Sequence, residues 1–208
     1  MLYRLFYIFF LLIISSISLA DKDHSNLLIY GDSISAGYGM DKEKQWSEQL
    51  QKILIEEKIG LTIINKSLSG ETTGGGLSRL EKIIDNSKPS YIFIELGGND
   101  ALRGYPPTKI KNNIQEMINL SIRKGVKVFL MQMRILPNYG KRYQTSFESI
   151  YKEVSEENNI PLIPFMLNDI ALNKELMLDD GIHPNATAQP LIAKFLYTNL
   201  LPLMSEVD

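Results

Sequence analysis

Five short apolar runs recur along the chain, and longer stretches of mixed polarity separate them. Most of these runs are continuously apolar rather than alternating, which is typical of strands that are covered on both faces of a sheet. The pattern predicts strands at Asn26–Tyr30, Leu61–Asn65, Tyr91–Leu96, Val126–Gln132 and Ile160–Phe165.

The stretches between the runs are long enough for helices that cross over a sheet. An alternation of strands and helices favours a parallel sheet between two helical layers, joined by right-handed crossovers. We therefore expect an α/β fold, a three-layer α/β/α sandwich of about five parallel strands, in a single domain over residues 21–208. The predicted helices are Gln45–Lys58, Gly76–Asn86, Thr108–Lys124, Tyr143–Asn158 and Ala186–Leu200.

Residues 1–20 have the features of a secretory signal peptide. Arg4 supplies a positive charge, an unbroken apolar run extends from Leu5 to Ile14, and Ser18-Leu-Ala20 resembles a cleavage site. An uncleaved anchor is the alternative, but the serines that follow the run leave it short for a bilayer span. We expect cleavage after Ala20, no stable membrane span in the mature chain, and a periplasmic or secreted location.

The composition excludes several classes of site. The chain has no cysteine, which rules out a thiol nucleophile, a disulfide scaffold and a thiolate metal site. Two histidines are too few for a histidine-rich zinc site, and no cluster of acidic residues stands out. The net charge of -2 does not indicate a nucleic-acid groove or a polybasic patch. We expect no metal, no cofactor and no nucleic-acid partner, but a monomer that acts on a small molecule.

Four loops that follow predicted strands are expected to meet at one edge of the sheet. They contain Gly31-Asp-Ser33, Ser69-Gly70, Gly97-Gly-Asn99-Asp100 and Met133–Tyr139. In open parallel sheets, ligands bind beyond the carboxyl ends of the strands. This edge is therefore where a site is expected.

Ser33 and His183 are the candidate nucleophile and base. A serine is a poor nucleophile until a base, most often histidine, takes its proton. The other histidine, His24, lies in a polar stretch just after the leader. Asp180 is placed to accept from the imidazole Nδ1–H and leave Nε2 for the serine, although spacing alone leaves Asp179 as an alternative. Gly-Asp-Ser by itself is equally typical of an ordinary turn.

Two further residues are candidates for binding a negative oxygen. The amide of Asn99 can donate a hydrogen bond at the edge of the sheet, although an asparagine there also commonly caps a helix. Gly70 can offer only its backbone N–H, and a simple turn is the alternative. Gly74-Gly-Gly76 is not followed by the Gly-Lys-Ser/Thr of a phosphate loop.

Taken together, these residues resemble the SGNH (GDSL-type) hydrolase family. Its blocks centre on a serine in Gly-Asp-Ser, a glycine, an asparagine in Gly-x-Asn-Asp and a histidine in Asp-x-x-His. Ser33, Gly70, Asn99 and His183 occur in that order, and the resemblance extends over residues 27–203. It implies a flavodoxin-like sandwich without a cofactor.

The resemblance also implies a role for each residue. Ser33 would be the nucleophile and His183 the general base and then the acid, with Asp180 orienting the imidazole. The oxyanion hole would combine the backbone N–H groups of Ser33 and Gly70 with the side-chain amide of Asn99. The expected reaction is hydrolysis of fatty-acyl thioesters, aryl esters and lysophospholipids through a Ser33 acyl-enzyme. A carbohydrate O-acetyl esterase and a non-catalytic binding protein are the alternatives.

The loop Leu102–Pro107 corresponds to one that moves in related esterases when an acyl chain binds. A rigid proline-rich connection is the alternative. On this basis the acyl chain is expected to contact Leu102, Tyr105, Leu136 and Tyr139.

Overall fold

A single five-stranded sheet forms the centre of the protein. The structure, a computed structural model, describes residues 25–135 and 137–204. All strands pair in parallel, in the order β2-β1-β3-β4-β5, which confirms the expected α/β fold. The strands are β1 (Ser25–Gly31), β2 (Leu61–Asn65), β3 (Tyr91–Glu95), β4 (Lys127–Met131) and β5 (Leu162–Ile163). The predicted signal peptide, His24 and Leu136 lie outside the described residues.

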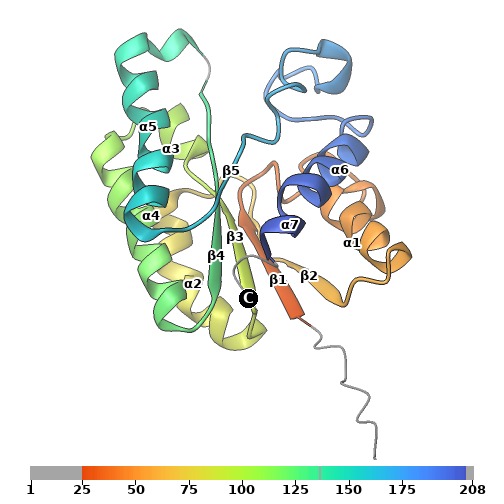
Figure 1. The fold of residues 1–208 in the computed structure, drawn as a ribbon. Coiled ribbons are helices and arrows are strands. Elements are labelled where there is room, and N and C mark those ends of the chain that lie inside the picture. Colours follow the sequence, from red (N-terminus) through yellow and green to blue (C-terminus); the bar gives the residue numbers. More distant parts are fainter. Residues whose placement is uncertain (1–24, 136, 205–208) are drawn as a thin grey trace, which may run out of the picture.

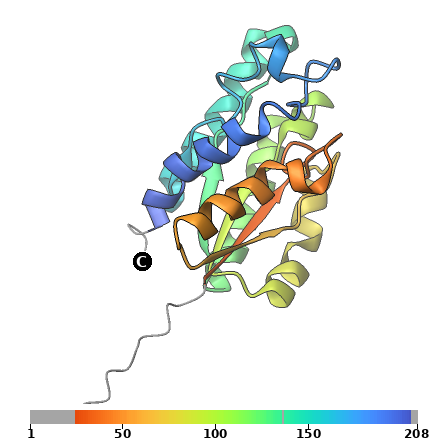
Figure 2. The same cartoon turned by 90° about the vertical axis from the view of Figure 1, so that its right-hand side faces the viewer.

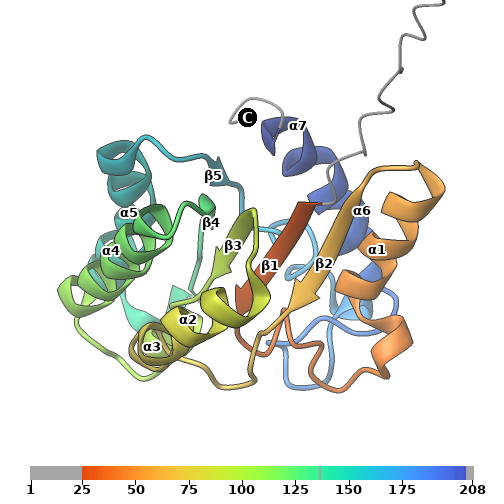
Figure 3. The ribbon, with the colours of Figure 1, turned by 90° about the horizontal axis from the view of Figure 1, so that it is seen from below.

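Helices cover both faces of the sheet, as Figures 1 and 3 show from two directions. One face carries α1 (Trp46–Glu56), α6 (Gln189–Asn199) and the short α7 (Leu201–Met204). The other carries α2 (Thr73–Ser87), α4 (Pro107–Arg123) and α5 (Lys141–Asn158). Figure 2 looks onto the first of these layers, where α1 and α6 pack side by side. The three-layer sandwich is therefore confirmed.

The central strands are buried on both faces, which accounts for their unbroken apolar sequences. All five residues of β3 are buried, as are the last five of β1. Within the first helical layer, the backbone N–H of Trp46, at the start of α1, donates to Gln189 Oε1 of α6 (3.0 Å). Among the described residues, no helix is both long and apolar enough to cross a bilayer.

Several element boundaries shift by one to three residues relative to the sequence prediction, including the start of α6 at Gln189, and three differences have a clear local reason. β5 is only two residues long because prolines flank it at 161 and 164, and proline has no N–H for a sheet ladder. α2 begins earlier than predicted because Thr72 Oγ1 caps it by accepting from the N–H of Gly75 (3.1 Å). A short helix, α3 (Gly98–Leu102), was not predicted, since its N-cap Gly97 and its first residue are both glycines.

Candidate active site

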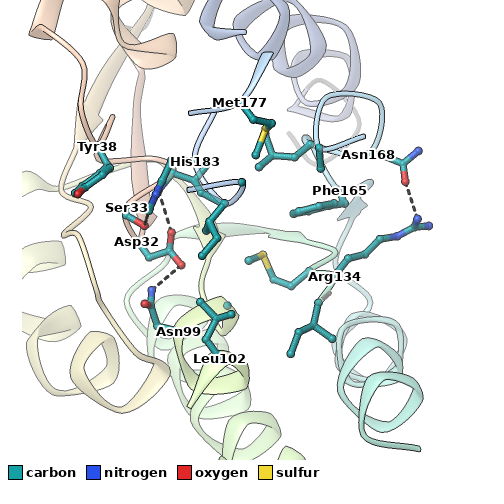
Figure 4. Close-up of a pocket in the computed structure, with 18 of the residues that line it drawn as sticks. Asp32, Ser33, Tyr38, Asn99, Leu102, Arg134, Phe165, Asn168, Met177 and His183 are labelled. Carbon is teal, nitrogen blue, oxygen red and sulfur yellow. Dashed lines mark hydrogen bonds between the residues drawn. The ribbon is translucent and has the colours of Figure 1, made fainter. Parts of the chain in front are cut away.

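Ser33 and His183 meet just beyond the carboxyl end of β1 (Figure 4). His183 Nε2 lies 2.8 Å from Ser33 Oγ, and its Nδ1 lies 2.7 Å from Asp180 Oδ2. The fold thus brings together residues that are 150 positions apart in the sequence. This geometry allows the imidazole to take the serine proton while the aspartate fixes the ring and stabilises the imidazolium.

The loop that carries His183 is held by Asp180 itself. Its Oδ1 accepts from the backbone N–H groups of Ile182 (2.9 Å) and His183 (3.0 Å), while Oδ2 faces the ring. Burial raises the pKa of Asp180, but the hydrogen bonds from His183 and Ile182 outweigh it and lower the pKa to about 2. Asp180, rather than Asp179, is therefore the carboxylate that faces the imidazole.

Three hydrogen-bond donors, one of them the backbone N–H of Ser33 itself, belong to residues that line the same cavity. Asn99 Nδ2 donates one N–H to Asp32 Oδ2 (3.0 Å) and keeps a second N–H for another acceptor. Gly70 has a left-handed φ of 78°, a conformation that glycine adopts without strain. Within residues 25–135 and 137–204, the backbone N–H groups of Ser33 and Gly70 donate to no protein acceptor. They remain available to a negative oxygen on a substrate.

Tyr38 is a site residue that sequence reasoning missed. Its ring packs against the His183 imidazole with centroids 4.3 Å apart and an interplanar angle of 30°. Its backbone N–H donates to the carbonyl of Ser33 (3.0 Å). Tyr38 lies between Gly37 and Gly39, both with positive φ, in a turn that carries no recognisable catalytic pattern.

A pair of buried carboxyl groups lies beneath the serine turn. Asp32 is 3% exposed and accepts from the N–H of Ile34 (3.1 Å) as well as from Asn99. Burial raises the pKa of Asp32 to about 6, although the hydrogen bonds that it accepts partly oppose this. Glu95 is fully buried, and burial together with the charge of Asp32 raises its pKa well above the usual range.

A cavity of about 780 Å³ extends from the serine across the carboxyl ends of the strands. In Figure 4, Ser33 and His183 lie at one side, Phe165 and Met177 lie further along, and Arg134 and Asn168 lie at the far side. Apolar side chains dominate the middle of the cavity, which suits an acyl chain. They are Met133, Ile135, Phe165, Leu167, Met177 and Ile182.

The residues predicted to bind the acyl chain are only partly in this cavity. Leu102 lines it. Tyr105 and Tyr139 lie outside the lining: the Tyr105 carbonyl accepts from Tyr143, and the Tyr139 hydroxyl donates to the Leu102 carbonyl (3.2 Å). Their contact with substrate, like that of Leu136, stays a prediction. Within the described chain, no three histidine or acidic side chains form a group that could hold a metal.

The sequence is similar to characterised hydrolases over most of its length. The model of the GDSL-like lipase/acylhydrolase family matches residues 29–189. An arylesterase from Vibrio mimicus is 45% identical over 185 residues, which is 89% of this chain and 92% of that protein. Thioesterase 1/protease 1/lysophospholipase L1 from Escherichia coli (strain K12) is 37% identical over 179 residues, covering 86% and 85%. The structure of the psychrotrophic esterase EstA from Pseudoalteromonas sp., inhibited by monoethylphosphonate, superposes with a TM-score of 0.85 at 39% identity, covering 87% and 99%.

Proposed function

We propose, given that this chain belongs to the GDSL-like lipase/acylhydrolase family, that it hydrolyses fatty-acyl esters and thioesters through an acyl-enzyme on Ser33. The proposal is carried by the contacts from Ser33 Oγ to His183 (2.8 Å) and from His183 to Asp180 (2.7 Å), next to a large apolar cavity. The names of the relatives, which include an arylesterase and a thioesterase/lysophospholipase, support this substrate class.

In the acylation step, Ser33 Oγ attacks the acyl carbonyl carbon and transfers its proton to His183 Nε2. Asp180, ionised because of its low pKa, stabilises the imidazolium that forms. The negative oxygen accepts from the N–H groups of Ser33 and Gly70 and from the free N–H of Asn99. Each such donor typically contributes about 2.7–4 kcal/mol to stabilisation of the transition state. The bond to the leaving oxygen or sulfur then breaks as His183 donates the proton to it.

Deacylation repeats the same steps with water as the nucleophile. His183 takes a proton from the water, which attacks the Ser33 ester, and then returns the proton to Ser33 Oγ as the fatty acid leaves. The Tyr38 ring, packed on the imidazole, covers one face of the base and limits its rotation through both steps.

The apolar cavity favours a fatty-acyl group over acetyl as the preferred acyl group. An acetyl group would leave most of the surface around Met133, Phe165 and Met177 without contact, and burial of apolar surface is the main source of binding energy there. Lysophospholipids and aryl esters of fatty acids place the same kind of acyl chain in the cavity and differ in their leaving group. A carbohydrate O-acetyl esterase is therefore the less favoured alternative.

We also propose that the protein is exported, is cleaved after Ala20 and works as a monomer in the periplasm or outside the cell. The composition of residues 1–20 supports export. Intact mass of the protein purified from a native-like host is expected to correspond to a chain that begins at Asp21. A mass that includes residues 1–20 would contradict it.

A fluorophosphonate probe tests the catalytic assignment directly. We expect the native protein to be labelled at one site and Ser33→Ala to remain unlabelled. Hydrolysis of p-nitrophenyl acetate and p-nitrophenyl octanoate then tests the substrate class, and kcat/KM is expected to be higher for octanoate. Equal labelling of the two proteins would refute the serine mechanism, whereas a strong acetate preference would favour the O-acetyl esterase.

A further inference from the structure

Glu95 lies directly against the strand end that leads to Ser33. It is the last residue of β3 and the register partner of Gly31, the last residue of β1. A Cβ placed on Gly31 would overlap Glu95 Oε2 and would lie 2.8 Å from the Ser35 side chain. Gly31 is not among the residues with positive φ. The glycine of Gly-Asp-Ser is therefore needed to leave room for a carboxyl group, not to allow a left-handed turn.

One oxygen of Glu95 holds the turn on both sides of the nucleophile. Glu95 Oε2 accepts from Ser35 Oγ (2.6 Å), two residues after Ser33, and from the backbone N–H of Asp32 (3.3 Å), one residue before it. No hydrogen bond joins Glu95 to Ser33 itself within the described chain. Glu95 therefore acts on the nucleophile only through the backbone of the turn.

The same turn also orients the Asn99 amide. Asp32 Oδ2 accepts one N–H of Asn99 Nδ2 and so fixes the orientation of the amide. The second N–H of that nitrogen remains available to another acceptor. Glu95 holds the backbone of Asp32, so a shift of Glu95 would move both the serine and the acceptor of the Asn99 amide. Two parts of the reaction centre thus depend on one buried side chain.

The surroundings of the two carboxyl groups distinguish which of them carries a charge. Both oxygens of Asp32 accept N–H donors, and His183 lies close enough to stabilise a negative charge on it. Glu95 is fully buried, and its Oε1 has no hydrogen-bond partner within the described residues. An ionised carboxylate in that position would be costly, and two neighbouring carboxylates would also repel each other. Tyr151, from α5, adds no positive charge there, and burial raises its own pKa.

We propose that Glu95 is a positioning residue that stays protonated beside an ionised Asp32 and fixes the Gly31–Ser35 turn, and through it the Asn99 amide. The inference rests on the proposed function, because the readout is hydrolysis of an acyl ester. A neutral side chain of the same shape, which can accept from Ser35 Oγ and from the Asp32 N–H, is therefore expected to fulfil the role of Glu95.

Two variants of the full mature protein test this, with p-nitrophenyl octanoate as substrate. Glu95→Gln keeps a neutral acceptor, so it is expected to retain kcat within about threefold and to keep the wild-type pH–rate profile. Glu95→Ala removes the acceptor and is expected to lower kcat about 10- to 100-fold with KM nearly unchanged. That loss approaches the effect of deleting one oxyanion donor, about 10²–10³-fold. Thermal unfolding of each variant separates loss of folded protein from loss of rate.

The outcomes distinguish this inference from the proposed function. If the wild type neither hydrolyses the ester nor reacts with the fluorophosphonate, the proposed function itself fails. If the wild type is active but Glu95→Gln loses as much kcat as Glu95→Ala, or shifts the pH at which kcat falls on the acid side, then a charged Glu95 is required and the inference is overturned. Unchanged kcat in a folded Glu95→Ala would overturn it as well.

A variant at the other end of the hydrogen bond covers the case in which Glu95→Ala does not fold. Ser35→Ala removes the donor to Oε2 and leaves Glu95 in place. It is expected to lower kcat severalfold without a change in KM, while Glu95→Gln remains active. Wild-type kcat in Ser35→Ala, or an inactive but folded Glu95→Gln, would contradict the inference.

Discussion

The side chain of Glu95 occupies the space that a Cβ on Gly31 would need, at the point where β1 and β3 end side by side. Gly31→Ala is therefore expected to destabilise the protein by about 1–3 kcal/mol, the usual cost of overpacking, and to lower kcat by displacing the turn. Urea unfolding and ester hydrolysis measure the two effects.

The matched control is Gly74→Ala, on the exposed first turn of α2, where the nearest neighbour of a Cβ is 3.7 Å away. It is expected to leave stability unchanged or to raise it slightly, since alanine has the higher helix propensity. In the double variant Gly31→Ala/Glu95→Ala, the cost of the alanine at 31 should become smaller, because the overlap with Glu95 is removed while the close approach to Ser35 remains. Strictly additive losses would show that they do not compete for space.

Asp180 and Asp179 are adjacent carboxylates with very different surroundings. Only Asp180 contacts the His183 ring, so Asp180→Asn is expected to lower kcat by about 10³–10⁴-fold, the scale known for loss of a triad aspartate. Asp179→Asn is the control and should change kcat by less than about twofold. Steady-state kinetics with p-nitrophenyl octanoate compares them, and similar losses in both variants would contradict the assignment.

The stability of the protein should depend on the charge of Asp32. Its pKa is raised to about 6 in the folded state, above the value of about 3.9 in an unfolded chain. A group with a raised pKa contributes stability that is fully present below its unfolded value and is lost as the pH rises through its folded value. Asp32→Asn should therefore gain stability relative to the wild type as the pH rises from about 4 to about 6. Unfolding midpoints across that range measure the difference, and a constant difference would refute the prediction.

Ionisation of Asp32, which lowers stability, is expected to support catalysis. As the pH falls through about 6, protonation of Asp32 weakens its hydrogen bond with Asn99, so kcat is expected to fall. Asp180, with a pKa of about 2, stays ionised throughout this range. In Asp32→Asn, the pH at which kcat falls on the acid side of the pH–rate profile should shift. A profile identical to that of the wild type would show that Asp32 does not contribute to this fall.

Acyl-chain preference should respond to side chains that line the cavity. Phe165→Ala and Leu102→Ala remove apolar contacts with a long chain, and we expect kcat/KM for octanoate to fall about tenfold while that for acetate changes little. Tyr105→Ala, outside the lining, is the comparison. A shift of its chain-length profile as large as that of Leu102→Ala would support the original expectation that the whole loop contacts substrate.

Much of the fold follows from local sequence patterns. The unbroken apolar runs of β1 and β3 mark strands that are buried on both faces, and their alternation with helices predicts the parallel sandwich. β5 was overestimated because its apolar composition is interrupted by prolines that cannot donate to a ladder. The start of α2 depended on a capping contact in which Thr72 accepts from Gly75, a residue of the glycine run that follows it.

The sequence by itself determined the candidate catalytic residues: one serine turn, one usable histidine, and the glycine and asparagine blocks that resemble a known family. These features are visible because each is a short pattern of neighbouring residues in the chain. The resemblance also pointed to Asp180 as the partner of His183. Only the tertiary structure decided that Tyr38 covers the imidazole, that Phe165 and Met177 line the cavity, and that Glu95 explains Gly31. These relationships join side chains from different strands and loops, and no local periodicity records a contact that forms only when the sheet is assembled.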